Sequence, residues 1–241
     1  MSRLYMIRHG QASFGASDYD ELSELGQLQM RVLGEYWKRW RGPFHAIYTG
    51  SLKRQKDSCR CFLEAYTNGG EAVPGPLELP EFNEYDTQSL LTDALPSAIM
   101  EREELATLVR ELNINSAEEL IKDRKAFQRL FSAVMDLWVK GEIESEGSES
   151  WAGFVDRVNK GLDKITAARQ GGKNVAVMTS GGPISVAMQR AMSCPDKTAL
   201  ELGWVIWNSS LTEFRYSGDK FSLAVFNSTP HLVEDELFSY R

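Results

Sequence analysis

The sequence predicts an α/β fold, a doubly wound and mainly parallel sheet with helices on both faces and a helical cap insertion. Short apolar runs at residues 3–7, 44–50 and 173–179 each precede a segment with helical spacing of apolar residues. Strands that alternate with helices pair in parallel and bury both sheet faces. Residues 87–147 show helical patterning and little strand signal. We therefore expect one domain over residues 1–241, with an insertion that covers one end of the sheet.

The first third of the chain alternates strand and helix. Apolar residues at helical spacing predict a helix over residues 22–40, with Ser23 as its N-cap. The second strand, at 44–50, leads into a second predicted helix over residues 51–66. Glycine and proline then cluster between residues 68 and 80, which predicts a loop.

The middle and the end of the chain complete the pattern. Amphipathic spacing predicts helices over residues 97–112, 116–140 and 149–170. After the strand at 173–179, a Gly-Gly-Pro turn leads into another helix. Residues 204–227 read as two strands joined by a Ser-Gly-Asp-Lys turn. The aromatic first strand of this pair is expected in the core, and the alternative is the edge of a homodimer.

Composition restricts the class of partner. The 241 residues carry a formal charge of −7, which argues against general affinity for nucleic acid or for a membrane surface. The sequence shows neither a secretory signal nor a stretch of membrane-spanning length. Its three cysteines lack metal-site spacing, so we expect reduced thiols in a cytoplasmic protein. A local basic pocket for a small anion is compatible with all of these totals.

Residues suited to anion binding follow three of the predicted strands. In open α/β sheets, ligands bind beyond the carboxyl ends of the strands. The strands deliver Arg8, His9 and Gly10; Gly50 and Ser51, with Arg54 one helical turn on; and Thr179, Ser180, Gly181 and Gly182. Guanidinium groups suit phosphate oxygens, and a helix N-terminus supplies unpaired N–H groups. Each feature alone is common on protein surfaces, and their combination at successive strand ends predicts a phosphate site.

Five segments carry a resemblance to a known family. They are "RHGQAS", "LSELGQLQM", "YTGSLKRQKDS", "FNEYDTQSLL" and "VAVMTSGGPIS". In this order they resemble the histidine phosphatase superfamily, the phosphoglycerate-mutase-like group whose hallmark is Arg-His-Gly after the first strand. The resemblance covers nearly the whole chain, and its nucleophile motif is highly specific in this setting.

The resemblance implies a mechanism without a metal or a cofactor. Neutral His9 would attack phosphorus and form a phosphohistidine, while Arg8 and Arg54 hold the equatorial oxygens. A carboxylic acid would protonate the leaving alcohol and then activate water. The family pattern favours Glu84 for this role, and Glu81, three residues earlier, is the alternative. Both carboxylates could instead be solvated loop residues.

The sequence departs from the family at the second histidine, which would fall at Ser180. A serine hydroxyl can donate a hydrogen bond, but it is shorter and never charged. With Gly182 as N-cap and Pro183 at the first helical position, the Ser180 hydroxyl would be free for ligand. The alternative is that Ser180 only caps the helix. Gly181 and Gln11, which stands where a glutamate is common, are the other expected substrate-binding residues.

The two remaining histidines are weaker candidates for the site. His45 begins the second strand, about 13 Å from its site end at about 3.3 Å per residue, so we expect a structural role. His231 follows the last strand, and the sequence does not place it.

Three functions remain open at this point. The first is a metal-independent phosphomonoester hydrolase that acts through His9 on a small-molecule or protein substrate, with a rate that Ser180 would lower. The second is a non-catalytic phosphate-binding or interaction module of the same fold. The third is a phosphoglycerate-mutase-like transferase, which Phe14 and Gly15 disfavour because mutases of the family usually carry Trp-Asn there. The charges of the insertion do not identify the alcohol part of the substrate.

Overall fold

The computed structural model describes residues 1–13, 20–67, 70, 73–114, 123–143, 149–167 and 172–240, apart from the side chain of Arg124. The chain divides into two compact units. The first comprises Met1–Glu84 and Arg157–Arg241, and the second comprises Tyr85–Asp156.

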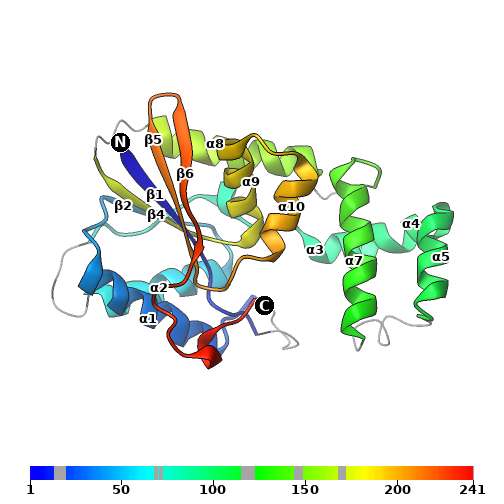
Figure 1. Ribbon diagram of the computed structural model, residues 1–241, viewed down its shortest axis with the longest axis horizontal. Coiled ribbons are helices and arrows are strands. Elements are labelled where there is room, and N and C mark those ends of the chain that lie inside the picture. Colours follow the sequence, from blue (N-terminus) through cyan, green and yellow to red (C-terminus); the bar gives the residue numbers. More distant parts are fainter. Residues whose placement is uncertain are drawn as a thin grey trace. The chain divides into compact units, whose positions relative to one another are not determined.

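A six-stranded mixed sheet forms the centre of the first unit (Figure 1). Its strands are β1 (Ser2–Arg8), β2 (Ala46–Thr49), β3 (Leu77–Glu78), β4 (Asn174–Thr179), β5 (Leu211–Ser217) and β6 (Lys220–Ser228), in the order β3-β2-β4-β1-β5-β6. The strands β3, β2, β4 and β1 run parallel, whereas β5 and β6 are antiparallel. The predicted α/β class with a mainly parallel sheet is confirmed.

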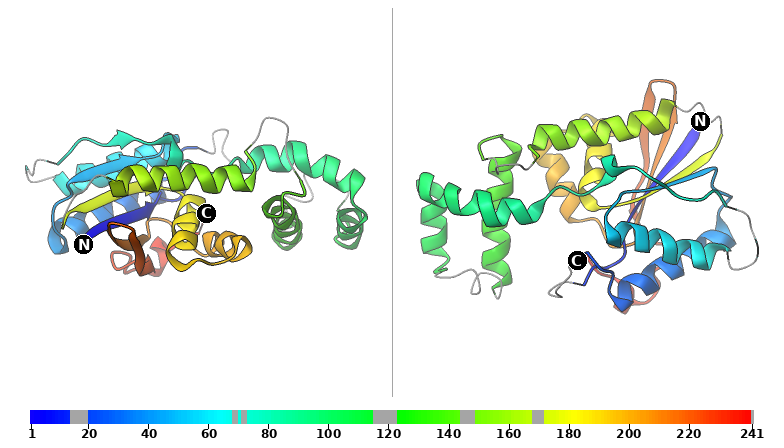
Figure 2. Two further views of the ribbon diagram at one scale, coloured as in Figure 1. Left: turned by 90° about the horizontal axis from the view of Figure 1, so that it is seen from above. Right: turned by 180° about the vertical axis from the view of Figure 1, so that it is seen from behind.

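Helices cover both faces of this sheet (Figures 1 and 2). On one side lie α1 (Glu24–Trp40) and α2 (Lys53–Thr67), and on the other α8 (Trp151–Ala167), α9 (Gly181–Met192) and α10 (Asp196–Trp204). Successive strand residues point to opposite faces. In β1, Tyr5 and Ile7 therefore join the core under α1 and α2, while Leu4 and Met6 are fully buried on the other face.

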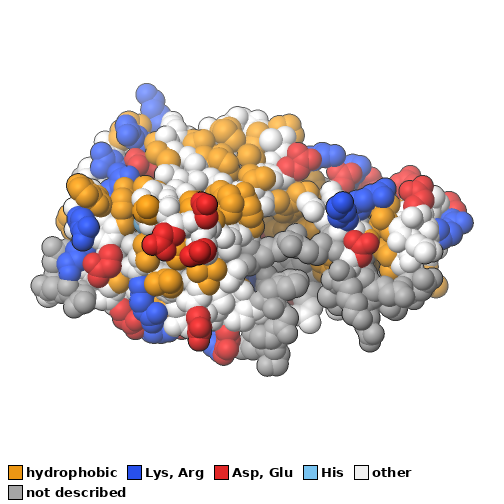
Figure 3. All heavy atoms as spheres, turned by 60° about the horizontal axis from the view of Figure 1, so that its bottom comes forward, with side chains coloured by type: hydrophobic (Ala, Val, Ile, Leu, Met, Phe, Trp, Pro, Cys, Tyr) orange, Lys and Arg blue, Asp and Glu red, His pale blue; other side chains and the backbone are white. Residues whose placement is uncertain are grey.

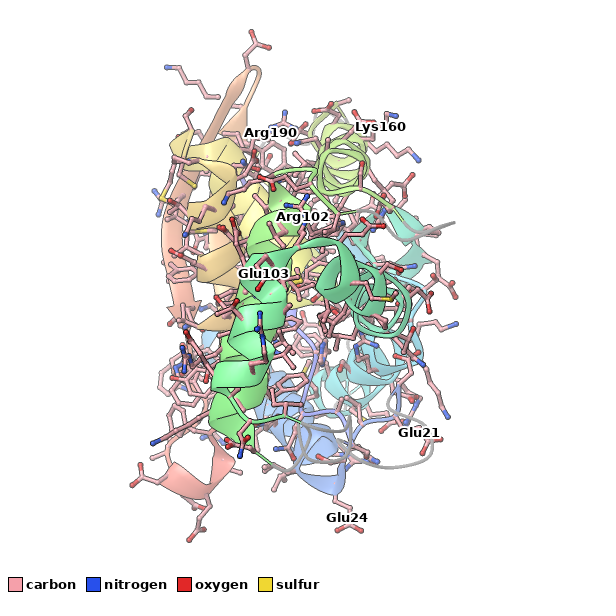
Figure 4. All side chains as sticks on the ribbon, turned by 90° about the vertical axis from the view of Figure 1, so that its right-hand side faces the viewer. Glu21, Glu24, Arg102, Glu103, Lys160 and Arg190 are labelled. Carbon is pink, nitrogen blue, oxygen red and sulfur yellow. The ribbon has the colours of Figure 1, made fainter. Side chains whose placement is uncertain are left out.

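Specific contacts fix these helices. The hydroxyl oxygen of Ser23 accepts a hydrogen bond from the Gly26 nitrogen at 3.0 Å, which confirms the predicted N-cap of α1. Near the C-terminal end of α1, Trp37 is fully buried and stacks on Phe44 with ring centroids 4.4 Å apart. On the opposite face, Arg190 extends from α9 (Figure 4) and pairs with Asp163 of α8 at 2.7 Å.

The second unit is helical where it is described. Its elements are α3 (Thr87–Ser89), a π-helical turn (Leu90–Ala94), α4 (Leu95–Glu101), α5 (Glu103–Glu111), α7 (Arg124–Val139) and the first turns of α8. Tyr85, Trp138, Trp151 and Phe154 pack their rings together, with centroids 5.1 to 6.4 Å apart. Its predicted position over one end of the sheet stays a prediction.

Several element boundaries differ from the sequence-based ones. The helix predicted over 97–112 breaks at Arg102, whose backbone is extended and whose guanidinium pairs with Glu142 at 2.6 Å. The short strand β3 and the helix α10 were not predicted, and residues 204–210 precede β5 rather than belonging to it. Parts of the helices predicted over 116–140 and 149–170 lie outside the described residues, as do Phe14 and Gly15.

The described surface is mixed in character. No helix in the described ranges combines the length and the apolar content needed to cross a bilayer. On the face in Figure 3, side chains of both charges lie among apolar and uncharged ones.

Candidate active site

The carboxyl ends of the parallel strands bring the predicted residues to one edge of the sheet. In the β1–β4 register Arg8 pairs with Thr179, and in the β2–β4 register Thr49 pairs with Met178. The ladder continues one step further, since the His9 nitrogen donates to the Thr179 carbonyl at 2.8 Å. His9 and Ser180 therefore occupy neighbouring positions just beyond β1 and β4.

His9 is held as a neutral ring with a defined tautomer. Its Nδ1 lies 2.7 Å from the carbonyl oxygen of Gly10, which can only accept, so Nδ1 carries the proton and Nε2 keeps its lone pair. Burial lowers the pKa of His9 well below its usual range, and the positive charges of Arg54 and Arg8 lower it further. The arrangement leaves Nε2 as an unprotonated nitrogen beside two arginines.

The backbone of His9 is held by hydrogen bonds from residues 208 and 209, which precede β5. Its carbonyl oxygen accepts from the Ser209 nitrogen and from Nδ2 of Asn208, both at 3.2 Å. Ser209 adopts a left-handed backbone with φ of 57°, and its hydroxyl lies 2.9 Å from Nε2 of His231. His231 is thus linked to the loop that carries His9, Gly10 and Gln11 through Ser209. Burial lowers the pKa of His231 to about 3.

Gly10 and Gly26 let the loop that carries His9 pass against the start of α1. A Cβ atom on Gly10 would lie 2.2 Å from the Gly26 carbonyl oxygen, and one on Gly26 would lie 2.1 Å from the Gln11 carbonyl oxygen. The Gly10 nitrogen also donates to Oγ of Ser58 in α2 at 3.1 Å. Only glycine fits such close approaches, so both helices hold the loop through its backbone.

Gln11 is tied into a network that reaches the end of the chain. Its backbone nitrogen donates to Oε1 of Gln29 at 2.9 Å, and its side-chain Oε1 accepts from Ser23 at 2.8 Å. The Nε2 of Gln29 donates to the Leu237 carbonyl at 2.7 Å and to the Ser239 hydroxyl at 2.9 Å. Segment 237–239 is therefore linked through Gln29 to the loop that carries His9.

The two arginines approach the site from different elements. The Nη1 of Arg8 donates to the carbonyl oxygen of Ile206. Arg54, in the first turn of α2, is 9% exposed and donates through Nη1 to Oδ1 of Asp20 at 2.6 Å. The same carboxylate accepts a hydrogen bond from the Lys53 backbone nitrogen at 2.7 Å. Asp20 therefore both caps the N-terminus of α2 and orients Arg54. Asp20 was not among the predicted residues.

The two candidate acids are separated by their surroundings. Both carboxylate oxygens of Glu84 lie 3.1 Å from the backbone nitrogen of Gly182, at the start of α9. Glu81 instead pairs with Lys164 of α8, and this hydrogen bond lowers the pKa of Glu81. Only Glu84 of the two contacts the helix start that carries Ser180.

Side chains that no motif indicated hold the loop of Glu84. The Nη1 of Arg157 lies 2.9 to 3.1 Å from the carbonyl oxygens of Pro80, Glu81 and Asn83. The amide of Asn83 accepts from the Ser51 nitrogen and donates to the Ser51 hydroxyl, both at 2.7 Å. These contacts fix the loop against the end of β2, and only tertiary structure could reveal them.

Ser180 is the N-cap of α9, so the expected cap at Gly182 is wrong. Gly181, Gly182 and Pro183 all lie within the helix, because Ser180 itself is the last residue with extended backbone. Its hydroxyl makes no cap hydrogen bond and accepts instead from Nε2 of Gln55 at 2.8 Å. Gln55 is fully buried and, like Asp20, was not predicted.

The remaining histidine lies away from these residues. His45 is exposed at the start of β2, and its Nδ1 accepts from the Asn174 nitrogen at 3.2 Å, at the opposite end of the sheet. Within the described ranges, no three His, Cys, Asp or Glu side chains gather as metal ligands would.

Comparison with known proteins identifies the family. The model of the histidine phosphatase superfamily, branch 1, matches residues 4–87 and 84–229. No curated protein sequence matches the chain. Among solved structures, phosphoglycerate mutase from Bacillus anthracis is similar with a TM-score of 0.60 and 20% identity, covering 95% of this chain and 94% of that one.

Two phosphatase structures are similar to the same extent. The α-ribazole phosphatase of Shigella flexneri has a TM-score of 0.62 and 18% identity. Phosphoserine phosphatase of Entamoeba histolytica, solved with 3-phosphoglyceric acid, has a TM-score of 0.61 and 17% identity. Each comparison covers 97% of this chain and 100% of the other. These likenesses establish the fold, and the family match spans nearly the whole sequence. The chain belongs to the histidine phosphatase superfamily, branch 1.

Proposed function

We propose that the protein is a metal-independent phosphomonoester hydrolase that acts through a phosphohistidine on His9. The observation that carries the proposal is the state of His9. Its ring is buried, its Nδ1 proton is directed at the Gly10 carbonyl, and its pKa is lowered by burial and by Arg54 and Arg8. A neutral Nε2 lone pair beside two guanidinium groups suits attack on a phosphate dianion.

The reaction takes place in two steps. In the first, Nε2 of His9 forms a bond to phosphorus while the ester P–O bond breaks, and Glu84 gives its proton to the leaving alkoxide. In the second, Glu84 takes a proton from water, whose oxygen attacks phosphorus and displaces His9. Inorganic phosphate leaves, and the starting protonation states return. Arg8 and Arg54 stabilise the charge on the equatorial oxygens in both steps.

Three further groups are assigned to binding. Ser180 and the Gly181 backbone face the phosphoryl oxygens at the start of α9, where N–H groups favour anions. Gln11 is assigned to positioning of substrate or water, since its side chain is anchored to Ser23. The proposal leaves the alcohol part of the substrate open, and it includes small molecules and phosphoproteins alike.

A second candidate, a non-catalytic phosphate-binding module, is supported by one observation. Ser180 stands where the family resemblance expects a second histidine, so one charged donor is missing. Loss of one preorganised donor costs about 10²- to 10³-fold in rate. A slow enzyme and a pure binder therefore differ in whether a phosphoenzyme forms. A mutase remains the third and least supported candidate.

The test is turnover of para-nitrophenyl phosphate with and without EDTA, together with acid-quench trapping of labelled phosphoprotein. We expect EDTA-resistant turnover and an acid-labile phosphoenzyme, both abolished by His9→Ala. The matched control is His45→Ala, at the opposite end of the sheet, which should retain both. Vanadate binding without turnover or phosphoenzyme would establish the non-catalytic module instead. Turnover that survives His9→Ala would reject the histidine route.

A further inference from the structure

The surroundings of Ser180 distinguish it from an ordinary cap residue. It follows β4 directly, beside His9, which follows β1 in the same register. Its side chain is fully buried, yet it does not bond to the N–H groups of its own helix. A buried hydroxyl at this position needs another partner, because an unsatisfied polar group in the interior costs free energy.

Gln55 supplies that partner in a fixed orientation. Its Nε2 lies 2.8 Å from Oγ of Ser180 and 3.0 Å from the carbonyl oxygen of Phe82. The Phe82 carbonyl can only accept, so the atom of the Gln55 amide that faces it must be nitrogen. The opposite amide atom, Oε1, faces the Leu52 nitrogen at 3.4 Å. Both N–H groups of the amide are therefore used, one toward Ser180 and one toward Phe82.

This orientation determines what the Ser180 hydroxyl can do. Because Oγ accepts from Gln55, its own hydrogen must point elsewhere, and no acceptor for it occurs in the part of the chain that the structure describes. Next to Ser180, a Cβ atom added to Gly181 would lie 4.0 Å from Oε2 of Glu84. Ser180 thus stands next to His9 across the β1–β4 ladder and one residue before the approach of Gly181 to Glu84, and its hydroxyl has one donor to spare.

We infer that Gln55 is a positioning residue that fixes the Ser180 hydroxyl as a neutral hydrogen-bond donor to the transferring phosphoryl group. The inference rests on the proposed function of the site. Unlike an imidazole, this donor does not titrate and adds no positive charge. The Gln55 amide also holds Phe82, two residues before Glu84, so one side chain sets the donor and the acid loop relative to each other.

The test measures vanadate binding by calorimetry, which does not depend on turnover, and then kcat and KM for para-nitrophenyl phosphate. The variants are Ser180→Ala, Gln55→Leu and the double variant. We expect Ser180→Ala to weaken vanadate binding about tenfold and to lower kcat about a hundredfold with little change in KM. Gln55→Leu should lower both at least as much, because it also releases Phe82.

The double variant separates positioning from packing. If Gln55 acts through Ser180, the double variant matches Gln55→Leu alone, since the hydroxyl is already misdirected. Independent roles would instead multiply the two single effects, and that result would overturn the inference. Ser185→Ala and Gln189→Leu, at a buried serine and at a glutamine of α9, are the controls and should leave vanadate affinity within twofold of the parent. Thermal unfolding verifies that each variant folds.

The remaining outcomes are also decisive. Parent-like vanadate affinity and kcat in Ser180→Ala would overturn the inference even if His9-dependent turnover is present. Absence of both vanadate binding and turnover in the parent would reject the proposed function itself. Binding without turnover would reject the hydrolase only, and the affinities of the variants would still test the donor.

Discussion

The two carboxylate oxygens of Glu84 and the backbone nitrogen of Gly182 form a symmetric contact, with both distances at 3.1 Å. The contact joins a loop after β3 to the helix after β4. Positive charge at a helix N-terminus favours a carboxylate there, so the contact draws the side chain toward the expected phosphate position. Glu81, only three residues earlier, turns to Lys164 instead.

This difference predicts which carboxylate variant loses activity. Glu84→Gln should lower kcat for an alkyl phosphate 10²- to 10⁴-fold, because an alkoxide needs the proton of a general acid. Phosphoenzyme formation from para-nitrophenyl phosphate should fall much less, since its leaving group departs without protonation. Steady-state and burst-phase kinetics measure the two effects. Glu81→Gln is the matched control, and equal losses in both variants would contradict the assignment of Glu84.

Gly26→Ala should destabilise the protein although it lies in a helix. Replacing glycine in a helix by alanine ordinarily gains up to about 1 kcal/mol. Here the new Cβ would lie 2.1 Å from the Gln11 carbonyl, so we expect a loss of about 1–3 kcal/mol in unfolding free energy and reduced turnover. Urea unfolding measures it. Gly153→Ala in α8 is the control, because its nearest contact is a flexible side-chain atom at 3.2 Å. A stabilised Gly26→Ala would show that the loop can move away.

Restoring a histidine at position 180 should require a second change. In Ser180→His the larger ring would meet the buried Gln55 amide, now 2.8 Å from the serine oxygen. We expect a lower melting temperature and weaker vanadate binding in this variant, from overpacking. Adding Gln55→Ala should recover both, because it removes the obstructing amide. A Ser180→His variant that melts and binds like the parent would show that the space is already present.

His231 should make stability dependent on acid pH. Burial lowers its pKa from 6.5 to about 3 in the folded protein, so the unfolded chain binds the extra proton. The contribution of His231 to the free energy of unfolding is therefore fully present above pH 6.5 and is lost as the pH falls toward 3. The variant His231→Gln can still form a hydrogen bond with Ser209. Between pH 7 and pH 5, its free energy of unfolding should fall by about 2 kcal/mol less than that of the parent. Urea unfolding at the two pH values measures this free energy. Equal losses in His231→Gln and in the parent would contradict the prediction. His9 contributes equally to both proteins.

The C-terminal segment should support the loop that carries His9 at a distance. Ser239 bonds Gln29 and Asn208, which in turn hold the backbones of Gln11 and His9. Deleting residues 237–241 should therefore lower kcat about tenfold or more and reduce the melting temperature, because the loop loses its outer support. Removing Arg241 alone keeps these contacts and is the control. Parent-like kinetics after the longer deletion would show that Gln29 and Asn208 suffice.

The elements that sequence reasoning located are those with local signals. The Ser23 cap, the β1 strand before Arg8 and the turn between β5 and β6 all follow from patterns within a few residues. The helix α10 was not predicted because it has only nine residues. It is preceded by Ser193, whose backbone is left-handed, and by Pro195, and it is followed by the segment before β5. At the break, Arg102 pairs with Glu142, a contact across 40 residues that no local pattern encodes.

The candidate site divides in the same way. Arg8, His9 and Ser180 could be named because each lies at or just after the end of a strand, and Arg54 because it lies in the first turn of the helix after β2. Gln55 and Arg157 could not, since both act through carbonyl groups distant in sequence. The choice between Glu84 and Glu81 was likewise undecided by spacing, and the Lys164 side chain that separates their surroundings comes from α8.

The strand order has a consequence for synthesis of the chain. The strand β1 is made first, but both of its neighbours, β4 and β5, come from the last third of the sequence. Until those segments leave the ribosome, the apolar residues of β1 have no sheet to join. Such long-range pairing slows folding and leaves an unpaired hydrophobic strand exposed to aggregation. His9 is therefore translated early, but the candidate site around it can assemble only after the last third of the chain has been synthesised.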